Sequence, residues 1–488
     1  MYLRRISRLA KFILQLLGYG LLCSLLGGIT VYILILESGP DLSVWHRADL
    51  GAEFTMESDI KQFSDYLALE DRLFRQLDEK VYAEVGTDRR FQLNRYSRGS
   101  LSDPGIWPVN WNRSFVLAND RPEAGVLLLH GLSDSPYSLR ALGERLHGAG
   151  AQVLGLRIPG HGSAPSALVE TRWQDMAAAV RIGAIEVQQS VGQQPFFIVG
   201  YSNGGALALE YTLASLEDTN LPRPAGVVLL SPEIAVSEIA AFAVWQARLG
   251  HLLGFEKLAW NAILPEYDPH KYGSFPVNAG DLAYRITTHI QERITALQAN
   301  GTLDAMPPVL AFQSIVDATV TPQALVANLF ARLPEGDHEL VLFDINRSVD
   351  IEELLRSDPM DLFRPLLHVD DLGYDLTVVT NENEQSRRVV AWRNDPDNPA
   401  EKLTDYRSEW PAGIYSLSHV ALPFSPEDPV YGGPLAAESP GIQLGNLDLR
   451  GERGVLRVSG TDLLRLRWNP FYDYVESRSL QFLQLPAP

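Results

Sequence analysis

The sequence predicts an α/β fold with a mostly parallel central sheet flanked by helices. From residue 114 onward, short apolar runs alternate with longer segments of helical periodicity, which is the pattern of successive β–α–β units. The apolar runs are continuous, as expected for strands whose two faces are both covered. With 488 residues, 46% of them hydrophobic, the chain can bury a large core.

The predicted elements follow one another in a regular order. In the first part of the fold, strands are expected at 114–120, 125–131, 151–162, 195–200 and 226–231, and helices at 138–150, 172–191 and 204–216. The alternation pauses from 232 to 306, where helical patterns dominate and no strong strand is evident. It resumes with strands at 307–317 and 338–345 around a helix at 322–333. Residues 376–393 are expected to form a hairpin around a polar turn.

These patterns divide the chain into eight segments. They are a cytoplasmic tail (1–11), a transmembrane anchor (12–36), a linker and N-terminal helical region (37–113), a first core part (114–231), a helical segment (232–306), a second core part (307–345), an insertion (346–412) and a C-terminal core part (413–488).

The N-terminal segment predicts a location. Residues 12–36 carry no charge, and as a helix they would measure about 37 Å, enough to cross a bilayer. Basic residues precede this stretch and acidic residues follow it, so the positive-inside rule predicts a cytoplasmic N-terminus and an extracytoplasmic remainder, periplasmic in a Gram-negative bacterium. A cleaved signal peptide is the alternative, but the apolar run is long for one and lacks a convincing small-x-small site.

A Gly-x-Ser-x-Gly motif at 200–204 provides a candidate nucleophile. It lies between an apolar strand and a helix, the context in which such a motif holds a serine on a sharp turn above the sheet. Glycines on both sides of the serine permit the close crossing of strand and helix. Ser202 is therefore the predicted nucleophile, although the motif taken alone also occurs by chance.

A serine nucleophile needs a base and an orienting acid. Asp317 is the predicted acid because it closes the strand at 307–317, and Asp344, at the end of a later strand, is the runner-up. His419, in "YSLSHVALPF", is the predicted base. The other candidates beyond Asp317 fit less well, since His338 begins a strand and so lies at the wrong edge, and His368 lies in the insertion.

An oxyanion hole completes the predicted site. Its donors should be the backbone N–H of the residue after the nucleophile and one from the loop after an earlier strand. In this sequence these are Asn203 and Leu132, the latter in "LLLHGLSDSP". His130 in the same loop is interpreted as structural.

Four stretches resemble the α/β-hydrolase superfamily. "LLLHGLSDSPYSLRALGERL", "VLGLRIPGHG", "IVGYSNGGALAL" and "QSIVDATVTP" are similar to its branch of monoglyceride lipases, lysophospholipases and serine aminopeptidases. The resemblance covers about 114–345 and resumes near 413. It implies a Ser-Asp-His triad and a helical cap at 232–306 that shapes the substrate pocket. The segment between Asp317 and His419 is longer than is usual in that family.

The predicted function is a membrane-anchored serine hydrolase that cleaves ester bonds of lipid-like or small acyl substrates. Acyl transfer and amide or peptide cleavage would use the same triad, and a catalytically silent binding module on this fold is the alternative from another class. No cofactor is expected, because metal-ligand motifs and phosphate loops are lacking. The net charge of −19 argues against a nucleic-acid partner.

Overall fold

The computed structural model describes most of the chain. The described residues are 12, 15–28, 30–31, 39–235, 256–349, 355–369, 372–394, 400–402, 409–447, 457 and 459–486.

One twisted sheet organises the described residues. Its strand order is β1–β3–β2–β4–β5–β8–β9–β10–β11–β12. The seven strands from β3 to β10 in this order run parallel to their neighbours, whereas β1, β11 and β12 pair antiparallel. Their bounds are β1 (Phe115–Leu117), β2 (Ala124–Leu129), β3 (Ala151–Leu156), β4 (Phe196–Tyr201), β5 (Gly226–Leu230), β8 (Val309–Ser314), β9 (Glu339–Phe343), β10 (Asp375–Asn381), β11 (Val389–Arg393) and β12 (Ala400–Lys402). The mostly parallel α/β sheet predicted from the sequence is confirmed.

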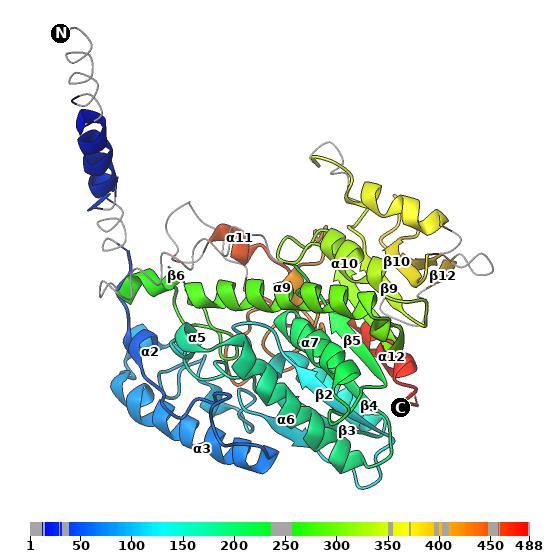
Figure 1. Cartoon of the computed structure of the whole chain (residues 1–488), viewed down its shortest axis with the longest axis horizontal. Coiled ribbons are helices and arrows are strands. Elements are labelled where there is room, and N and C mark those ends of the chain that lie inside the picture. The colour runs from blue at the N-terminus through cyan, green and yellow to red at the C-terminus, as the bar shows by residue number, and fades with distance from the viewer. Residues whose placement is uncertain are drawn as a thin grey trace, which may run out of the picture.

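Helices cover both faces of this sheet (Figure 1). Successive strand residues point to opposite faces, so Leu127 and Leu129 of β2 belong to one buried cluster and Val126 and Leu128 to the other. The first cluster contains residues of α3 (Phe63–Lys80), α6 (Trp173–Val191), α7 (Asn203–Glu217), α9 (Val277–Ala299) and α10 (Pro322–Asn328). The second contains residues of α4 (Arg140–Gly148) and α12 (Tyr472–Phe482). Burial on both faces explains why the strands are continuous apolar runs.

The segment predicted as an insertion at 346–412 extends the sheet. β10 pairs parallel with β9, and the predicted hairpin is present as the antiparallel pair of β10 and β11. The open edge of β9 would otherwise leave a row of unpaired backbone groups. The added strands therefore complete the sheet, rather than interrupting it.

The helical segment predicted at 232–306 has two described parts. The helix α9 packs against α5 (Ala167–Glu170), α6 and α7. Before it, the short antiparallel strands β6 (Trp260–Ala262) and β7 (Phe275–Pro276) enclose a loop. These two strands were not predicted, because each is too short to give a periodic signal. The helical pattern predicted at 238–255 lies outside the described residues.

The N-terminal region at 39–113 packs on the core through a buried charge cluster. Arg157, which follows β3, is fully buried, and its guanidinium contacts the carboxylates of Glu53 and Glu70 at 3.0 Å and 2.9 Å. The hydroxyl of Tyr66 in α3 donates to the Arg157 carbonyl oxygen at 2.6 Å. Breaking one partner of such a buried pair costs several kcal/mol, so these contacts fix α3 against the core.

The predicted transmembrane segment is only partly described. Residues 15–28 are helical. Among the described residues, none of the helices has the length and apolarity needed to span a membrane. Residues 13–14, 29 and 32–36 of the predicted span lie outside the described residues.

Candidate active site

Ser202 occupies the sharp turn between β4 and α7. Its backbone has φ 53° and ψ −118°, a conformation that non-glycine residues rarely adopt and that is typical of functional sites. The turn is tight because a Cβ atom at Gly200 would lie 2.4 Å from the Gly204 carbonyl oxygen, and one at Gly204 would lie 2.0 Å from the Leu129 oxygen. The Ser202 N–H donates to the Leu230 carbonyl at 2.9 Å. The two glycines thus allow β4 and α7 to hold Ser202 at the carboxyl edge of the sheet.

His419 lies within hydrogen-bonding distance of Ser202. It begins a short 3₁₀ helix (His419–Ala421), and its Nε2 lies 3.1 Å from the Ser202 Oγ. The ring of Tyr201 lies beside the imidazole, with 5.5 Å between ring centroids, and the Tyr201 hydroxyl donates to the His419 carbonyl at 3.4 Å. A residue far along the chain is thereby held beside the strand-to-helix turn.

Asp317 orients the imidazole from the other side. Its Oδ2 lies 2.8 Å from the His419 Nδ1 and also accepts from the Gln313 amide at 2.9 Å. Its Oδ1 accepts from the backbone N–H groups of Thr319 and Val320 at 2.8 Å and 3.0 Å. Since an ionised carboxylate only accepts hydrogen bonds, the His419 Nδ1 carries the proton. The Nε2 atom is therefore free to accept the Ser202 proton.

The structure separates the runner-up residues from Ser202. The Asp344 carboxylate, after β9, contacts the Arg347 guanidinium at 2.7 Å and accepts from the Thr380 hydroxyl. His338 precedes β9, and its Nδ1 accepts from the Val309 backbone N–H at 3.1 Å. His368 ends a 3₁₀ helix (Arg364–His368) in the segment before β10. None of the three residues has a hydrogen bond to Ser202 or His419 among the described residues.

The two residues of the predicted oxyanion hole lie near Ser202. Asn203 is the first residue of α7, and Leu132 lies in the loop after β2, where it lines a cavity together with Ser202. Within the described part of the chain, neither backbone N–H has a hydrogen-bond acceptor. Two such donors at a helix N-terminus and a loop can stabilise a developing oxyanion.

His130 holds the loop after β2 in place. Its Nε2 accepts from the Ile158 N–H at 3.0 Å, and its Nδ1 lies 2.9 Å from the Gly131 carbonyl oxygen. Burial and the neighbouring His161 place the pKa of His130 well below its ordinary value. The ring is therefore a neutral link between the loops that follow β2 and β3, as the structural interpretation expected.

Glu233 is a site residue that the sequence did not predict. Its N–H donates to the Ser202 carbonyl at 3.0 Å, and its carboxylate accepts from the Asn203 side-chain amide at 3.1 Å. Burial raises the pKa of Glu233. The only sequence signal was its position three residues beyond β5, an edge where polar residues gather.

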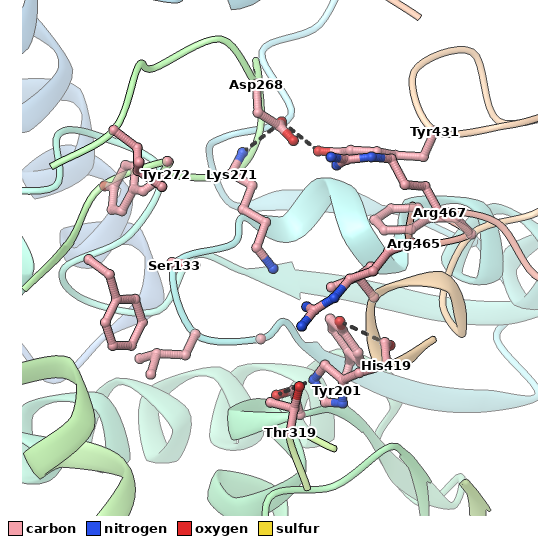
Figure 2. Close-up of a pocket in the computed structure, with 18 of the residues that line it drawn as sticks. Ser133, Tyr201, Asp268, Lys271, Tyr272, Thr319, His419, Tyr431, Arg465 and Arg467 are labelled. Atoms are coloured by element: carbon pink, nitrogen blue, oxygen red, sulfur yellow. Dashed lines mark hydrogen bonds between the residues drawn. The ribbon is translucent and has the colours of Figure 1, made fainter. Parts of the chain in front are cut away.

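Ser202 and His419 line a cavity of about 360 Å³. Figure 2 shows His419 and other residues of its lining. Its floor is formed by Ser202, His419 and the loop 131–133. The loop before β7 and a C-terminal segment form the remaining wall. The wall residues are Leu264, Tyr267, Asp268, Lys271, Tyr272, Gly273, Phe275, Val420, Phe424, Tyr431, Arg465 and Arg467. The predicted cap segment therefore contributes to the cavity through the loop 264–275, whereas α9 packs on the helices beside the sheet.

Residues 120–345 match the family model described as serine aminopeptidase, S33. A thermostable monoacylglycerol lipase from Bacillus sp. strain H-257 is 32% identical over 117 residues, which are 24% of this chain and 44% of that protein. The chain thus spans less than half the length of this curated relative.

Solved structures also align with the chain. A monoacylglycerol lipase from Paleococcus ferrophilus is 20% identical, with a TM-score of 0.35 over 47% of this chain and 88% of the other. A soluble variant of monoglyceride lipase from Saccharomyces cerevisiae is 16% identical, with a TM-score of 0.34 over 47% and 81%.

The family model covers β2 to β9 and the turn that holds Ser202. The curated relative carries a monoglyceride lipase name, and the sheet and nucleophile turn match the architecture expected from the four sequence stretches. Residues 120–345 are therefore similar to the α/β-hydrolase superfamily, in its branch of monoacylglycerol lipases and serine aminopeptidases.

Proposed function

We propose that this protein is a serine hydrolase that cleaves ester bonds of lipid-like or small acyl substrates. The observation that carries the proposal is the hydrogen-bonded chain from Ser202 Oγ through His419 to Asp317, with distances of 3.1 Å and 2.8 Å. It lies at the floor of a cavity with apolar and polar walls. The match to a monoacylglycerol lipase supports ester substrates over amides.

The proposed reaction runs through an acyl-enzyme. Ser202 Oγ attacks the acyl carbonyl carbon while His419 Nε2 takes its proton, and the N–H groups of Asn203 and Leu132 hold the resulting oxyanion. The C–O bond of the ester breaks, and His419 returns the proton to the leaving alcohol. A water molecule then attacks the acyl-enzyme with His419 again as the base, which releases the acid and restores Ser202. Asp317 orients His419 and stabilises its protonated form throughout.

A panel of ester substrates, tested on wild type and on variants of the candidate base histidines, tests this proposal. The purified full chain should hydrolyse p-nitrophenyl esters and monoacylglycerols, and H419A should lower kcat by about a thousand-fold or more. H338A is the matched control, since His338 is also buried but binds the backbone at the opposite edge of the sheet. Amide turnover exceeding ester turnover would contradict the ester assignment, and equal activities of H419A and wild type would contradict the mechanism.

We also propose that residues 12–36 anchor the enzyme in a membrane, with the N-terminus cytoplasmic and the catalytic domain extracytoplasmic. The proposal is supported by the uncharged stretch and its flanking charges. Residues 15–28 are helical, and apolar side chains along them, such as Leu21 and Leu25, are exposed at 76% and 61%. An exposed apolar helix of this kind needs an apolar environment.

Membrane fractionation tests the anchor. The wild type should stay in the membrane pellet after an alkaline wash, with an intact N-terminal peptide in its mass spectrum. The double variant L21R/L25R should move to the soluble fraction, whereas L464R, at another exposed leucine, should not. A wild type found soluble, or one cleaved after the apolar run, would contradict the anchor.

A further inference from the structure

Three cationic side chains line the wall of the cavity above Ser202. Lys271 comes from the loop before β7, and Arg465 and Arg467 come from the segment before α12. Figure 2 shows Lys271 and Arg465 extending into the cavity from different sides. Three cationic side chains in one cavity are unexpected on a chain with a net charge of −19. Cations gathered inside a cleft do not increase the solubility of an acidic protein, so solubility does not explain them.

The packing of Leu466 orients the two arginines, Arg465 and Arg467, that flank it. Leu466, between the two arginines, packs against the core cluster on the α4 and α12 face of the sheet, while Arg465 and Arg467 line the cavity. The Ser418 hydroxyl donates to the Leu466 carbonyl. Since Ser418 immediately precedes His419, the arginine segment is fixed directly to the loop that carries the imidazole.

The three cations have few ion pairs with carboxylates of the described residues. Within the described part of the chain, Arg465 has no hydrogen bond or ion pair, and the Arg467 guanidinium contacts the neutral Tyr267 hydroxyl at 3.5 Å. The Lys271 Nζ lies 4.0 Å from the Asp134 carboxylate, the outer limit for an ion pair.

Two acidic residues, Asp268 and Glu233, also line the cavity, and neither carboxylate forms an ion pair with another described residue. The Oδ1 of Asp268 accepts from the Tyr431 hydroxyl at 2.6 Å and from the backbone N–H groups of His270 and Lys271 at 2.9 Å and 3.0 Å. Burial raises the pKa of Asp134 to about 7, so its charge near neutral pH is incomplete. The cavity therefore presents two guanidinium groups, those of Arg465 and Arg467, that have no ion pair with a described carboxylate.

Apolar residues line the same cavity. Leu264, Phe275, Val420 and Phe424 share its wall with the cations, and such a combination suits a ligand with an apolar part and a fixed anionic group. Guanidinium groups bind carboxylates and phosphates through paired charge-assisted hydrogen bonds. An uncharged ester would leave the guanidinium groups of Arg465 and Arg467 without an anionic partner among the described residues.

We infer that the natural substrate is an ester that also carries a carboxylate or phosphate group, which Arg465 binds with Lys271 and Arg467. This inference rests on the proposed ester hydrolysis at Ser202. The anionic group can belong to the acyl part or to the alcohol part of the ester, and both arrangements place the charge within the cavity that contains the scissile bond.

Two matched substrate pairs test the inference and locate the anionic group. Mono-p-nitrophenyl adipate and p-nitrophenyl hexanoate differ by a carboxylate at the end of the acyl chain. A 1-acylglycerol 3-phosphate and the corresponding monoacylglycerol differ by a phosphate on the alcohol. We expect wild type to prefer the charged member of at least one pair by about ten-fold or more in kcat/KM, and added salt should reduce this preference.

The variants R465Q and K271Q should lower the preference for the charged member, by about ten-fold for R465Q. R121Q is the matched control. Arg121 is an exposed arginine in the turn before β2, at the edge of the sheet opposite to the one that carries Ser202. The R121Q variant should show the wild-type preference for the charged ester. A wild type without preference for either charged ester, or an R465Q variant with the wild-type preference, would overturn the inference.

Labelling by an uncharged fluorophosphonate separates this result from failure of the proposed function. Labelled Ser202 without a preference for charged esters contradicts the anionic substrate alone. A folded wild type that is not labelled contradicts the hydrolase proposal itself, and the inference that rests on it.

Discussion

The neighbouring strands β4 and β5 end in the same way, yet only one end has the surroundings of a nucleophile. Ser202 follows β4 and Ser231 follows β5, with φ values of 53° and 42°. Each serine N–H donates to a carbonyl on the next strand, from Ser202 to Leu230 at 2.9 Å and from Ser231 to Phe312 at 2.8 Å. The two turns therefore share their backbone strain and their place at the carboxyl edge of the sheet.

The two serines differ in what surrounds their hydroxyl groups. The Ser202 hydroxyl contacts His419 and lines the cavity, whereas Ser231 is fully buried and its hydroxyl has no hydrogen-bond partner within the described residues. A strained serine at a strand end is thus a consequence of the sheet architecture and occurs at both strands. Ser202 differs from Ser231 in having an imidazole and a cavity beside its hydroxyl, and we attribute its proposed nucleophilic function to these two features.

Removal of each serine hydroxyl is the strongest test of this comparison. S202A should lower ester turnover by about a million-fold, because the nucleophile is lost. S231A should leave kcat/KM within about two-fold of wild type and change the free energy of unfolding by less than about 1 kcal/mol. Turnover of p-nitrophenyl esters measures kcat/KM, and urea unfolding measures the free energy of unfolding. A large activity loss in S231A, with its fold intact, would show that the β5 end takes part in the reaction.

Replacement of the orienting acid should have the next largest effect. D317N keeps the side-chain shape but offers an amide to His419, so kcat should fall by about ten-thousand-fold. D344N is the control at the end of β9, where the carboxylate binds Arg347 and Thr380, and it should affect stability more than kcat. If D344N were the variant with the greater loss of kcat, Asp317 would not be the acid of the triad.

The close crossing of β4 and α7 next to Ser202 predicts how glycine substitutions change stability. In G204A the new methyl group would lie 2.0 Å from the Leu129 oxygen, so the free energy of unfolding should fall by about 3 kcal/mol or more. G280A, in the helix α9 with open space around the glycine, should gain about 0.5–1 kcal/mol. Chemical unfolding of both variants checks the pair, and a tolerated G204A with full activity would contradict the described turn.

The smallest predicted effect concerns the carboxylate next to the β5 end. Burial raises the pKa of Glu233 above its ordinary value of 4.5. The folded state then binds more protons than the unfolded state above this pH, so the contribution of Glu233 to the free energy of unfolding decreases as pH rises. E233Q does not titrate and retains an acceptor for Asn203. Its stability relative to wild type should increase as the pH rises above about 4.5. A pH-independent difference would contradict this.

The sequence predicted those parts of the site that depend on local chain geometry. The end of β4 could be recognised because a strand, two glycines and a helix must occur together around Ser202. Asp317 followed from its position at the end of β8. His419 followed from its position where the chain returns to the core, with the resemblance supporting the order of the three residues.

The remaining wall of the cavity could not be predicted. Lys271 lies in a loop without periodicity, and the direction of Arg465 depends on Leu466 packing into a core formed by distant segments. Glu233 acquires its role only because β4 and β5 are neighbours. The sheet extension by β10 also escaped recognition, since the segment between Asp317 and His419 was interpreted as an insertion outside the core.

Labelling by a fluorophosphonate, with the modified peptide identified by mass spectrometry, tests the central proposal most directly. The proposed triad predicts one modified site at Ser202 in wild type and in S231A, and no modification in S202A. A folded wild type that does not react, or a label that persists in S202A, would contradict the assignment of Ser202 as the nucleophile.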